Sequence, residues 1–270
     1  MFNNQKEVTR ETLYHWILRR NTVTTKDILD HFNDQAGSKY IYIKYLHPLL
    51  NQGKIDRVRR GLYTGIDPIT GEPVADRFIV ASKIRLDYYL GYHTALDFYG
   101  STYSYRSESQ VCVKPGQRFR EFRYRGVTYT PVYTSDTRRG IQTTRYRGHS
   151  IRVCGKERLL IECIDRPGHI GGWEQTLKSL QVLGGIRHEM IPTLLADRGS
   201  QKLIRKTGYI LELLKDNSVF HSHLPDKVLD KLEGMVKGQP MYLETGRRGP
   251  LSERWQLYIP ESFPEYLRGV

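Results

Sequence analysis

Residues 38–63 decide the fold: Ser38-Lys-Tyr-Ile-Tyr-Ile-Lys-Tyr-Leu-His-Pro-Leu-Leu-Asn-Gln52 predicts a helix, and Lys54-Ile-Asp-Arg-Val-Arg-Arg-Gly-Leu-Tyr63 follows it after one glycine. In the first stretch the apolar side chains recur on one side of a helix, whereas Lys39, Tyr40 and Lys44 fall on the other. The second stretch predicts two short strands joined around Arg59-Arg60-Gly61. Ser38 is placed to cap the helix. Pro48 is expected to kink or break it, which leaves residues 39–47 as the presented segment.

Two further helices are predicted upstream. Apolar residues at helical spacing indicate one over residues 5–19, and Thr24 with Asp27 resembles a capping box that starts the next. Three helices followed by a basic hairpin are typical of a winged helix, which places its third helix in the DNA major groove and its hairpin against phosphate or in the minor groove. The predicted DNA-binding residues are Ser38, Lys39, Tyr40, Lys44, Arg57, Arg59 and Arg60. A winged helix that contacts protein instead, or a small helical domain with an inert hairpin, is the alternative.

The charge of the chain favours polyanionic partners. Its 270 residues are enough for two domains, and 42 Lys and Arg against 29 Asp and Glu give a net charge of +13 and a pI of about 9.6. Residues 1–66 hold eleven basic and six acidic side chains, and residues 101–160 hold thirteen and four. The cationic surface therefore belongs to two separate segments, although a solvated basic surface without a specific partner is an alternative for the second.

Several classes of protein are disfavoured. No stretch approaches the roughly 18 apolar residues of a membrane span, and no secretory signal begins the chain, so a cytoplasmic protein without a membrane partner is expected. Cys112, Cys154 and Cys163 form no Cys-x-x-Cys pair and predict small buried or free thiols rather than a zinc site. We expect no metal and no cofactor.

The rest of the chain predicts an α+β fold: an N-terminal winged helix-turn-helix over 1–66, a linker at 67–75, and a C-terminal domain over 76–270 with an antiparallel sheet and several helices. Helices are expected at 76–84, 92–99, within 173–214 and at 226–236. Strands are expected at 110–115, 119–124, 127–133, 140–146 and 149–153, with Arg125-Gly126 and Arg147-Gly148 as tight turns, and two short strands at 241–244 and 255–259 close the chain.

Arginines mixed with aromatic residues follow the predicted sheet. A second nucleic-acid or partner surface is predicted at Arg118, Arg120, Arg123, Arg125, Arg145 and Arg147. Arginine packed beside tyrosine on an exposed sheet face is equally compatible with a structural pairing, and both interpretations stay open.

No pattern in the chain indicates catalysis. The serine-hydrolase, metalloprotease and Walker motifs are absent, Gly171-Gly172 fits a tight turn better than a phosphate cradle, and His221-Ser-His223 is typical of a solvated loop. We therefore expect no catalytic residue and no enzyme. The alternative is a nucleic-acid-processing enzyme that a winged helix targets to DNA.

Three motifs in order carry a family resemblance: Arg57-Val-Arg-Arg-Gly-Leu-Tyr63, Gly91-Tyr-His-Thr-Ala-Leu-Asp-Phe-Tyr-Gly100, and Glu157-Arg-Leu-Leu-Ile-Glu-Cys-Ile-Asp-Arg-Pro167 with Gly171-Gly172 after it. Over most of its length the chain resembles the AbiEi family, the antitoxin and transcriptional-regulator half of bacterial and archaeal abortive-infection toxin–antitoxin systems. The resemblance implies an N-terminal domain that represses its own operon and a C-terminal domain that neutralises a nucleotidyltransferase-like toxin, directly or indirectly, since type IV systems need no stable complex.

The same resemblance bears on partners and residues. Because one winged helix reads only a few base pairs, we expect two copies on an inverted repeat in the promoter of the protein's own operon. Arg158, Asp165, Arg166 and Gly172 belong to the C-terminal signature of the family, and an ion-pair network is the role expected of the charged ones.

Overall fold

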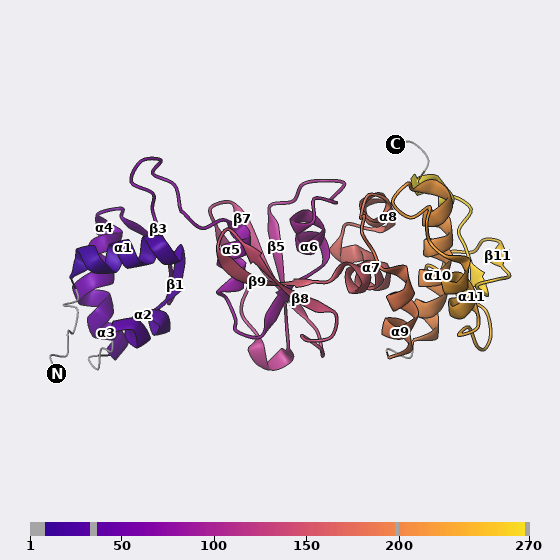
Figure 1. Ribbon diagram of the computed structural model, residues 1–270, viewed down its shortest axis with the longest axis horizontal. Coiled ribbons are helices and arrows are strands. Elements are labelled where there is room, and N and C mark those ends of the chain that lie inside the picture. The colour runs from indigo at the N-terminus through magenta and orange to yellow at the C-terminus, as the bar shows by residue number, and fades with distance from the viewer. Residues whose placement is uncertain (1–8, 33–36, 198–199, 268–270) are drawn as a thin grey trace. The chain divides into compact units, whose positions relative to one another are not determined.

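The computed structural model describes residues 9–32, 37–197 and 200–267, which form two compact units. Unit 1 comprises the chain up to residue 90 together with 107–137 and 144–152, and unit 2 comprises 91–106, 138–143 and the chain from 153 onward. The fold is mixed α+β, with antiparallel and mixed sheets (Figure 1). The predicted division of the chain into a domain at 1–66, a linker at 67–75 and a domain at 76–270 stays a prediction.

Unit 1 begins with short helices and a hairpin. Its first elements are α1 (Arg10–Arg20), β1 (Thr22–Thr24), α2 (Thr25–Phe32), α3 (Gly37–Ile41), α4 (His47–Asn51), β2 (Ile55–Arg59) and β3 (Leu62–Gly65). α1 begins after its cap Thr9, and the predicted start at residue 5 lies outside the described residues. The capping box predicted for the second helix is confirmed, since Thr24 Oγ1 accepts from the Asp27 N–H at 3.0 Å and Asp27 Oδ2 accepts from the Thr24 N–H at 2.8 Å.

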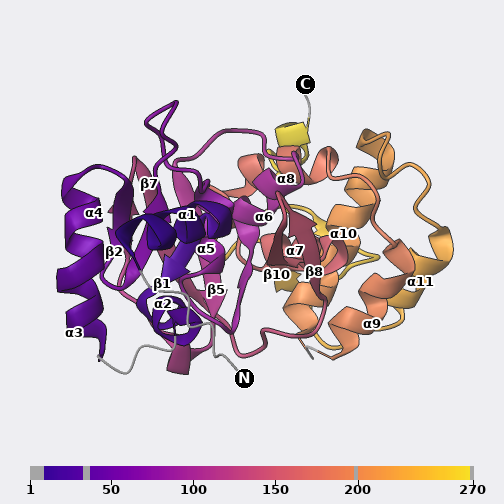
Figure 2. The same ribbon diagram turned by 60° about the vertical axis from the view of Figure 1, so that its left-hand side comes forward.

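The third helical segment runs from Gly37 to Asn51. A π-helical turn (Tyr42–Leu46) joins α3 to α4, and Figure 2 shows the three pieces as one continuous rod. The segment therefore continues through Pro48 to Asn51, one residue short of the predicted end at Gln52. It also begins one residue before Ser38, the predicted cap, which lies inside α3.

The π-helical turn accommodates Pro48. The His47 N–H donates to the Tyr42 carbonyl, five residues back, and so widens the turn just before the proline. Pro48 has no N–H to offer the Lys44 carbonyl, which accepts a hydrogen bond from Arg10 Nε of α1 at 3.1 Å instead. Of the predicted kink or break, the break does not occur, because a side chain from another helix replaces the missing backbone donor.

A small sheet completes this part of unit 1. β3 lies between β1 and β2 and is antiparallel to both, and the pairing of β2 with β3 shifts register between Arg57 and Arg59. The bulge interrupts the alternation that would place these two arginines on one face of the strand. One hydrophobic cluster fills the space between the strands and helices, and its fully buried members include Leu13, Ile17, Ile28, Ile41, Leu46 and Leu49.

A second sheet has six strands in the order β6-β7-β5-β4-β9-β8. They are β4 (Tyr88–Leu90), β5 (Glu108–Val113), β6 (Phe122–Tyr124), β7 (Val127–Tyr133), β8 (Ile141–Tyr146) and β9 (His149–Cys154), and α5 (Arg77–Ser82) precedes them. β5 and β7 are parallel, so the prediction of an antiparallel sheet is wrong at this pair. Side-chain alternation shows which face of a strand is buried, but it does not show the direction of the strand. The chain passes through β6 between β5 and β7, so β7 runs in the same direction as β5.

Two predicted tight turns are confirmed. Arg125 and Gly126 have φ values of +46° and +80°, and Arg147 and Gly148 have +46° and +81°. Positive φ at both central residues is what a two-residue hairpin turn of the primed type requires, with glycine at the second position. The repeated Arg-Gly pair therefore fixes two hairpin tips of the same geometry.

Unit 2 is mainly helical (Figure 1). Its elements are α6 (Tyr92–Phe98), α7 (Lys156–Asp165), α8 (Trp173–Gln181), α9 (Ile191–Ala196), α10 (Gln201–Asn217), α11 (Asp226–Glu233), β10 (Met241–Tyr242), β11 (Leu251–Ser252) and β12 (Leu257–Tyr258). Trp255 packs against α10 where Gly208 leaves room, since a Cβ there would lie 2.0 Å from the indole. Over the three described ranges, no helix combines the length and apolar character needed to cross a membrane.

Several residues that attract notice in the sequence are structural. Arg158 Nε donates to Glu162 Oε1 at 2.8 Å in a buried ion pair, as expected. Gly171 and Gly172 have φ values of +112° and +99° in the turn before α8, which confirms the tight turn. The three cysteines are free and buried, as predicted.

The prediction of a solvated loop is wrong for His221, which is fully buried. Its Nε2 lies 2.9 Å from the Leu180 carbonyl and must carry the hydrogen, so its Nδ1 accepts from His188 Nε2 at 3.1 Å. Burial lowers the pKa of both imidazoles, that of His188 to about 4. His223 is exposed.

Candidate nucleic-acid interface

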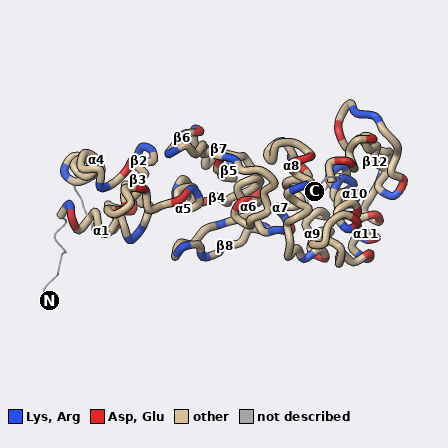
Figure 3. Tube along the Cα trace, turned by 90° about the horizontal axis from the view of Figure 1, so that it is seen from above, with Lys and Arg blue, Asp and Glu red and all other residues tan. Residues whose placement is uncertain are grey.

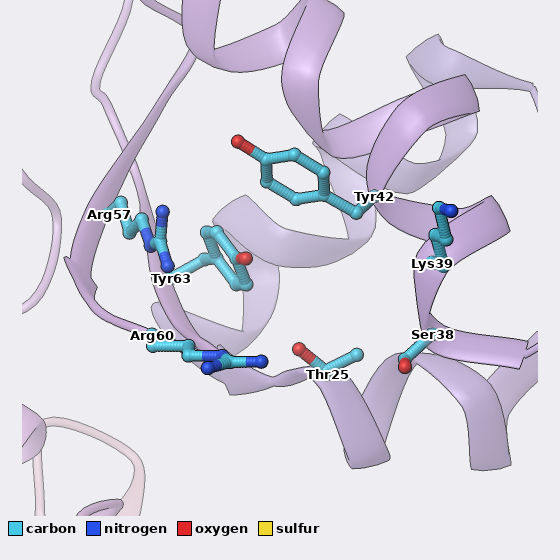
Figure 4. Close-up of a pocket in the computed structure, with 8 residues that line it drawn as sticks. Thr25, Ser38, Lys39, Tyr42, Arg57, Arg60 and Tyr63 are labelled. Atoms are coloured by element: carbon cyan, nitrogen blue, oxygen red, sulfur yellow. The ribbon is translucent and has the colours of Figure 1, made fainter.

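A pocket of about 560 Å³ opens between the start of the third helical segment and the β2–β3 hairpin (Figure 4). The residues that line it are Thr25, Ser38, Lys39, Tyr42, Arg57, Arg60, Gly61 and Tyr63. Figure 4 shows Arg57 and Arg60 on the hairpin side and Ser38 and Lys39 on the helix side. We call this pocket and its lining residues the basic groove.

Cations and hydroxyl groups form the walls of the basic groove. Lys39, Arg57 and Arg60 are exposed, and none of the described lining residues is acidic. The Asp56 carboxylate, next to Arg57 in the chain, accepts from the Arg57 backbone N–H at 2.8 Å through Oδ1, while its Oδ2 is engaged elsewhere. Burial raises the pKa of Tyr63, whose phenol therefore stays neutral. Such a set of donors suits an anion with several oxygens.

Lys44 lies further along the same helical segment and is held by two tyrosines. Its Nζ donates to Tyr40 Oη at 2.6 Å and sits 5.0 Å and 5.1 Å from the ring centroids of Tyr40 and Tyr45. These contacts raise the pKa of the Lys44 ammonium, first through the Tyr40 hydroxyl and then through Tyr45. The charge of this exposed lysine is therefore fixed in one place on the outer face.

Arg59, the third predicted hairpin arginine, points away from the basic groove. Its guanidinium stacks over Phe122 at 4.9 Å and Phe119 at 5.9 Å, and Arg85 lies over the same Phe119 ring at 5.5 Å. Burial and the charge of Arg85 lower the pKa of Arg59. The structure therefore brings Arg57 and Arg60 together and separates Arg59 from them, because of the bulge in β2.

The second predicted surface contains the sequence Arg-Tyr-Arg-Gly twice, at 123–126 and 145–148. In the first turn Asp56 Oδ2 accepts from Tyr124 Oη at 3.0 Å and from Arg125 Nε at 3.0 Å. The second turn repeats the arrangement at another aspartate. We call these the twin turns, and in each the second arginine is neutralised by a carboxylate from elsewhere in unit 1.

In the second twin turn Asp76 Oδ2 accepts from Tyr146 Oη at 2.7 Å and lies 3.5 Å from Arg147 Nη1. The first arginines of the turns, Arg123 and Arg145, are exposed, as is Arg120. Arg118 lies over the Tyr133 ring at 5.5 Å. Figure 3 shows the basic residues of these hairpins in blue. The structural-pairing interpretation therefore holds for Arg118, Arg125 and Arg147, whereas a binding surface at Arg120, Arg123 and Arg145 stays a prediction.

One solved structure that matches the chain is that of the RV2827C protein from Mycobacterium tuberculosis. The match has a TM-score of 0.62 at 16% sequence identity and covers 98% of this chain and 95% of that one. At this identity the likeness concerns the fold, which the two chains share over nearly their whole length. No family model and no curated protein matches the sequence.

Sequence reasoning missed the hydroxyl-bearing part of the basic groove. Thr25, Tyr42 and Tyr63 line it beside the predicted cations, but they come from α2, the π-helical turn and β3. Their pattern in the sequence is that of core-facing residues, and only the approach of the hairpin to the helix gives them a common surface. Within the described parts of the chain, no group of three or more His, Cys, Asp or Glu is arranged to hold a metal ion.

Proposed function

We propose that the N-terminal part of unit 1 is a winged helix that binds duplex DNA, with the third helical segment in the major groove and the β2–β3 hairpin on the phosphate backbone. The element order supports this proposal: α1, β1, α2, the third helical segment, and then a hairpin whose second strand pairs with β1. That arrangement packs the hydrophobic cluster on one side of the third segment and leaves its other side to solvent.

The basic groove is the observation that carries the proposal. Arg57 and Arg60 project from the hairpin, and Lys39 from the start of the third segment, with no acid among the described lining residues. Phosphate oxygens accept hydrogen bonds from guanidinium and ammonium groups, and release of the counterions they displace favours binding. The spacing of one helix and one hairpin around a cationic pocket suits a backbone that runs between them.

For the whole chain we propose a DNA-binding autorepressor that is also the antitoxin of a phage-defence toxin–antitoxin system. Two copies would occupy an inverted repeat in the promoter of its own operon, because symmetric pairing multiplies the short sequence that each winged helix reads. This part of the proposal rests on the resemblance to the AbiEi family. The role is one of binding rather than catalysis.

Neutralisation of a nucleotidyltransferase-like toxin belongs, in this proposal, to the chain beyond residue 75. Exposed Arg120, Arg123 and Arg145 supply cations that can compete for a nucleic-acid substrate of the toxin or contact an acidic surface of the toxin itself. Salt weakens both routes and does not separate them. A pull-down with the toxin separates the two routes, because only contact with the toxin itself gives a complex.

The experiment uses the full chain and its variant Arg57→Glu with Arg60→Glu in cells that carry the toxin gene and a reporter behind the operon promoter. We expect the variant to lose repression and to keep protection against toxin supplied from an unrelated promoter. A variant that still represses would refute the proposed DNA surface. Loss of protection by a variant that remains folded would refute the proposed division of roles.

A further inference from the structure

We propose that Ile43 reads the 5-methyl group of a thymine in the major groove, an inference that rests on the DNA-binding function proposed above. Ile43 lies in the π-helical turn at the middle of the third helical segment, and 59% of its surface is exposed. Among the described residues up to 66, the large hydrophobic side chains that are exposed are Ile43 and Tyr40. The ring of Tyr40 is already engaged with Lys44, whereas Ile43 points an aliphatic surface to solvent.

The fold itself gains little from isoleucine at this position. A β-branched side chain has a lower helix propensity than alanine. At an exposed position, the small apolar area that the side chain buries does little to offset that cost. The hydrophobic cluster is completed by the neighbours on either side, since Tyr45 and Leu46 belong to it and Tyr42 packs against it. Ile43 is therefore an apolar group on the outward face of the segment.

The surroundings of Ile43 identify its partner. Lys39 precedes it by four residues, His47 follows by four, and the fixed ammonium of Lys44 is adjacent; all three are exposed. A rim that carries the ammonium groups of Lys39 and Lys44 around an apolar centre does not suit an apolar protein surface, because docking there would desolvate the charges. It suits duplex DNA, whose phosphates meet the cations while the major groove offers one apolar group, the thymine methyl.

The test begins with the selection of bound sequences from random duplexes by the full chain. Each thymine of the selected site is then replaced singly by deoxyuridine, which removes the methyl group and leaves every hydrogen-bonding group in place. We expect one thymine in each half-site whose replacement weakens binding about four-fold, the effect of one buried methyl group. Other thymines should respond less.

The variant Ile43→Ala decides whether this residue makes the contact. Alanine raises helix propensity, so the variant is expected to fold. Its affinity for the thymine duplex should fall, and the difference between thymine and deoxyuridine at the critical position should vanish. Ile69→Ala is the matched control: Ile69 is 92% exposed in the turn that begins at Asp67, and its loss should leave the four-fold difference unchanged.

The outcomes separate this inference from the proposed function. Selective binding in which no thymine is sensitive, or in which Ile43→Ala keeps the same sensitivity, refutes the methyl contact and leaves DNA binding intact. A change of oligomeric state in Ile43→Ala, with unchanged base preference, assigns the side chain to contact with a second copy and also refutes it. Absence of duplex binding by the full chain refutes the proposed function and this inference together.

Discussion

The basic groove and the twin turns carry the same type of side chain in opposite electrostatic settings. Arg57 and Arg60 line a pocket without an acidic residue among its described walls, whereas Arg125 and Arg147 meet Asp56 and Asp76. Each carboxylate also accepts a hydrogen bond from a tyrosine hydroxyl, which fixes the position of the carboxylate. A segment that is strongly basic in sequence can therefore have much of its charge neutralised within the fold, and net charge alone does not locate a binding surface.

The largest effect should come from reversing charge in the basic groove. Arg57→Glu with Arg60→Glu removes two phosphate contacts and adds two repulsions, so duplex affinity at about 0.1 M salt should fall on the order of a thousand-fold. The matched variant, Arg123→Glu with Arg145→Glu, reverses the exposed arginines of the twin turns and should lose less than about ten-fold, because screening limits a charge that does not touch DNA. Fluorescence anisotropy with a labelled duplex measures both. Equal losses would mean that groove and twin turns form one interface.

A second contrast sets the exposed cations of unit 1 against the buried His188–His221 pair of unit 2. Burial holds the pKa of His188 at about 4, below its unfolded value of about 6.5, so its contribution to stability is complete above pH 6.5 and declines as the pH falls towards 4. The free energy of unfolding should drop by about 2 kcal/mol between pH 7.5 and pH 5 from this group.

Chemical denaturation at the two pH values checks this prediction. His188→Gln should flatten the pH dependence, while His223→Gln, at an exposed neighbour, should keep it. Identical pH profiles for His188→Gln and the unmodified protein would show that the buried pair does not govern acid stability. Duplex binding by the basic groove should change little over this range wherever the protein stays folded, because its cations are lysine and arginine.

A smaller effect should distinguish the twin turns from each other. Tyr124→Phe and Tyr146→Phe each remove one hydrogen bond to an aspartate and should lower the free energy of unfolding by about 1 kcal/mol. Only Tyr124→Phe should also weaken duplex binding, by about two- to three-fold, because the Asp56 that it holds belongs to β2, which presents Arg57. Anisotropy and denaturation on the same samples measure both effects. Equal binding by the two variants would show that Asp56 does not position the hairpin.

The sequence predicts the parts of the fold that depend on local chemistry. The Thr24–Asp27 capping box, the two Arg-Gly turns and the hairpin around Arg60-Gly61 follow from residue types at fixed spacings, and all are present. Strand direction does not follow from alternation, which is why the parallel pairing of β5 with β7 was not expected.

At the candidate site, the features that the sequence does not predict depend on contacts between segments that are distant in the chain. Arg10 replaces the donor that Pro48 lacks, and no local pattern indicates that partner. The bulge in β2 separates Arg57 from Arg59, and the stacking of Arg59 on Phe122 joins residues 63 positions apart. Charge and position along the chain thus predicted a basic hairpin, but not which of its arginines face the groove.

The salt dependence of duplex binding tests the central claim most directly. Each lost phosphate contact lowers the slope of log K against log salt concentration by about 0.9, so Arg57→Ala with Arg60→Ala should reduce it by about two units relative to the unmodified chain. Arg59→Ala with Arg60→Ala should reduce it by only about one, because Arg59 stacks on Phe122. An unchanged slope for the first pair, or an equal reduction for both pairs, would contradict the assignment of DNA binding to the basic groove.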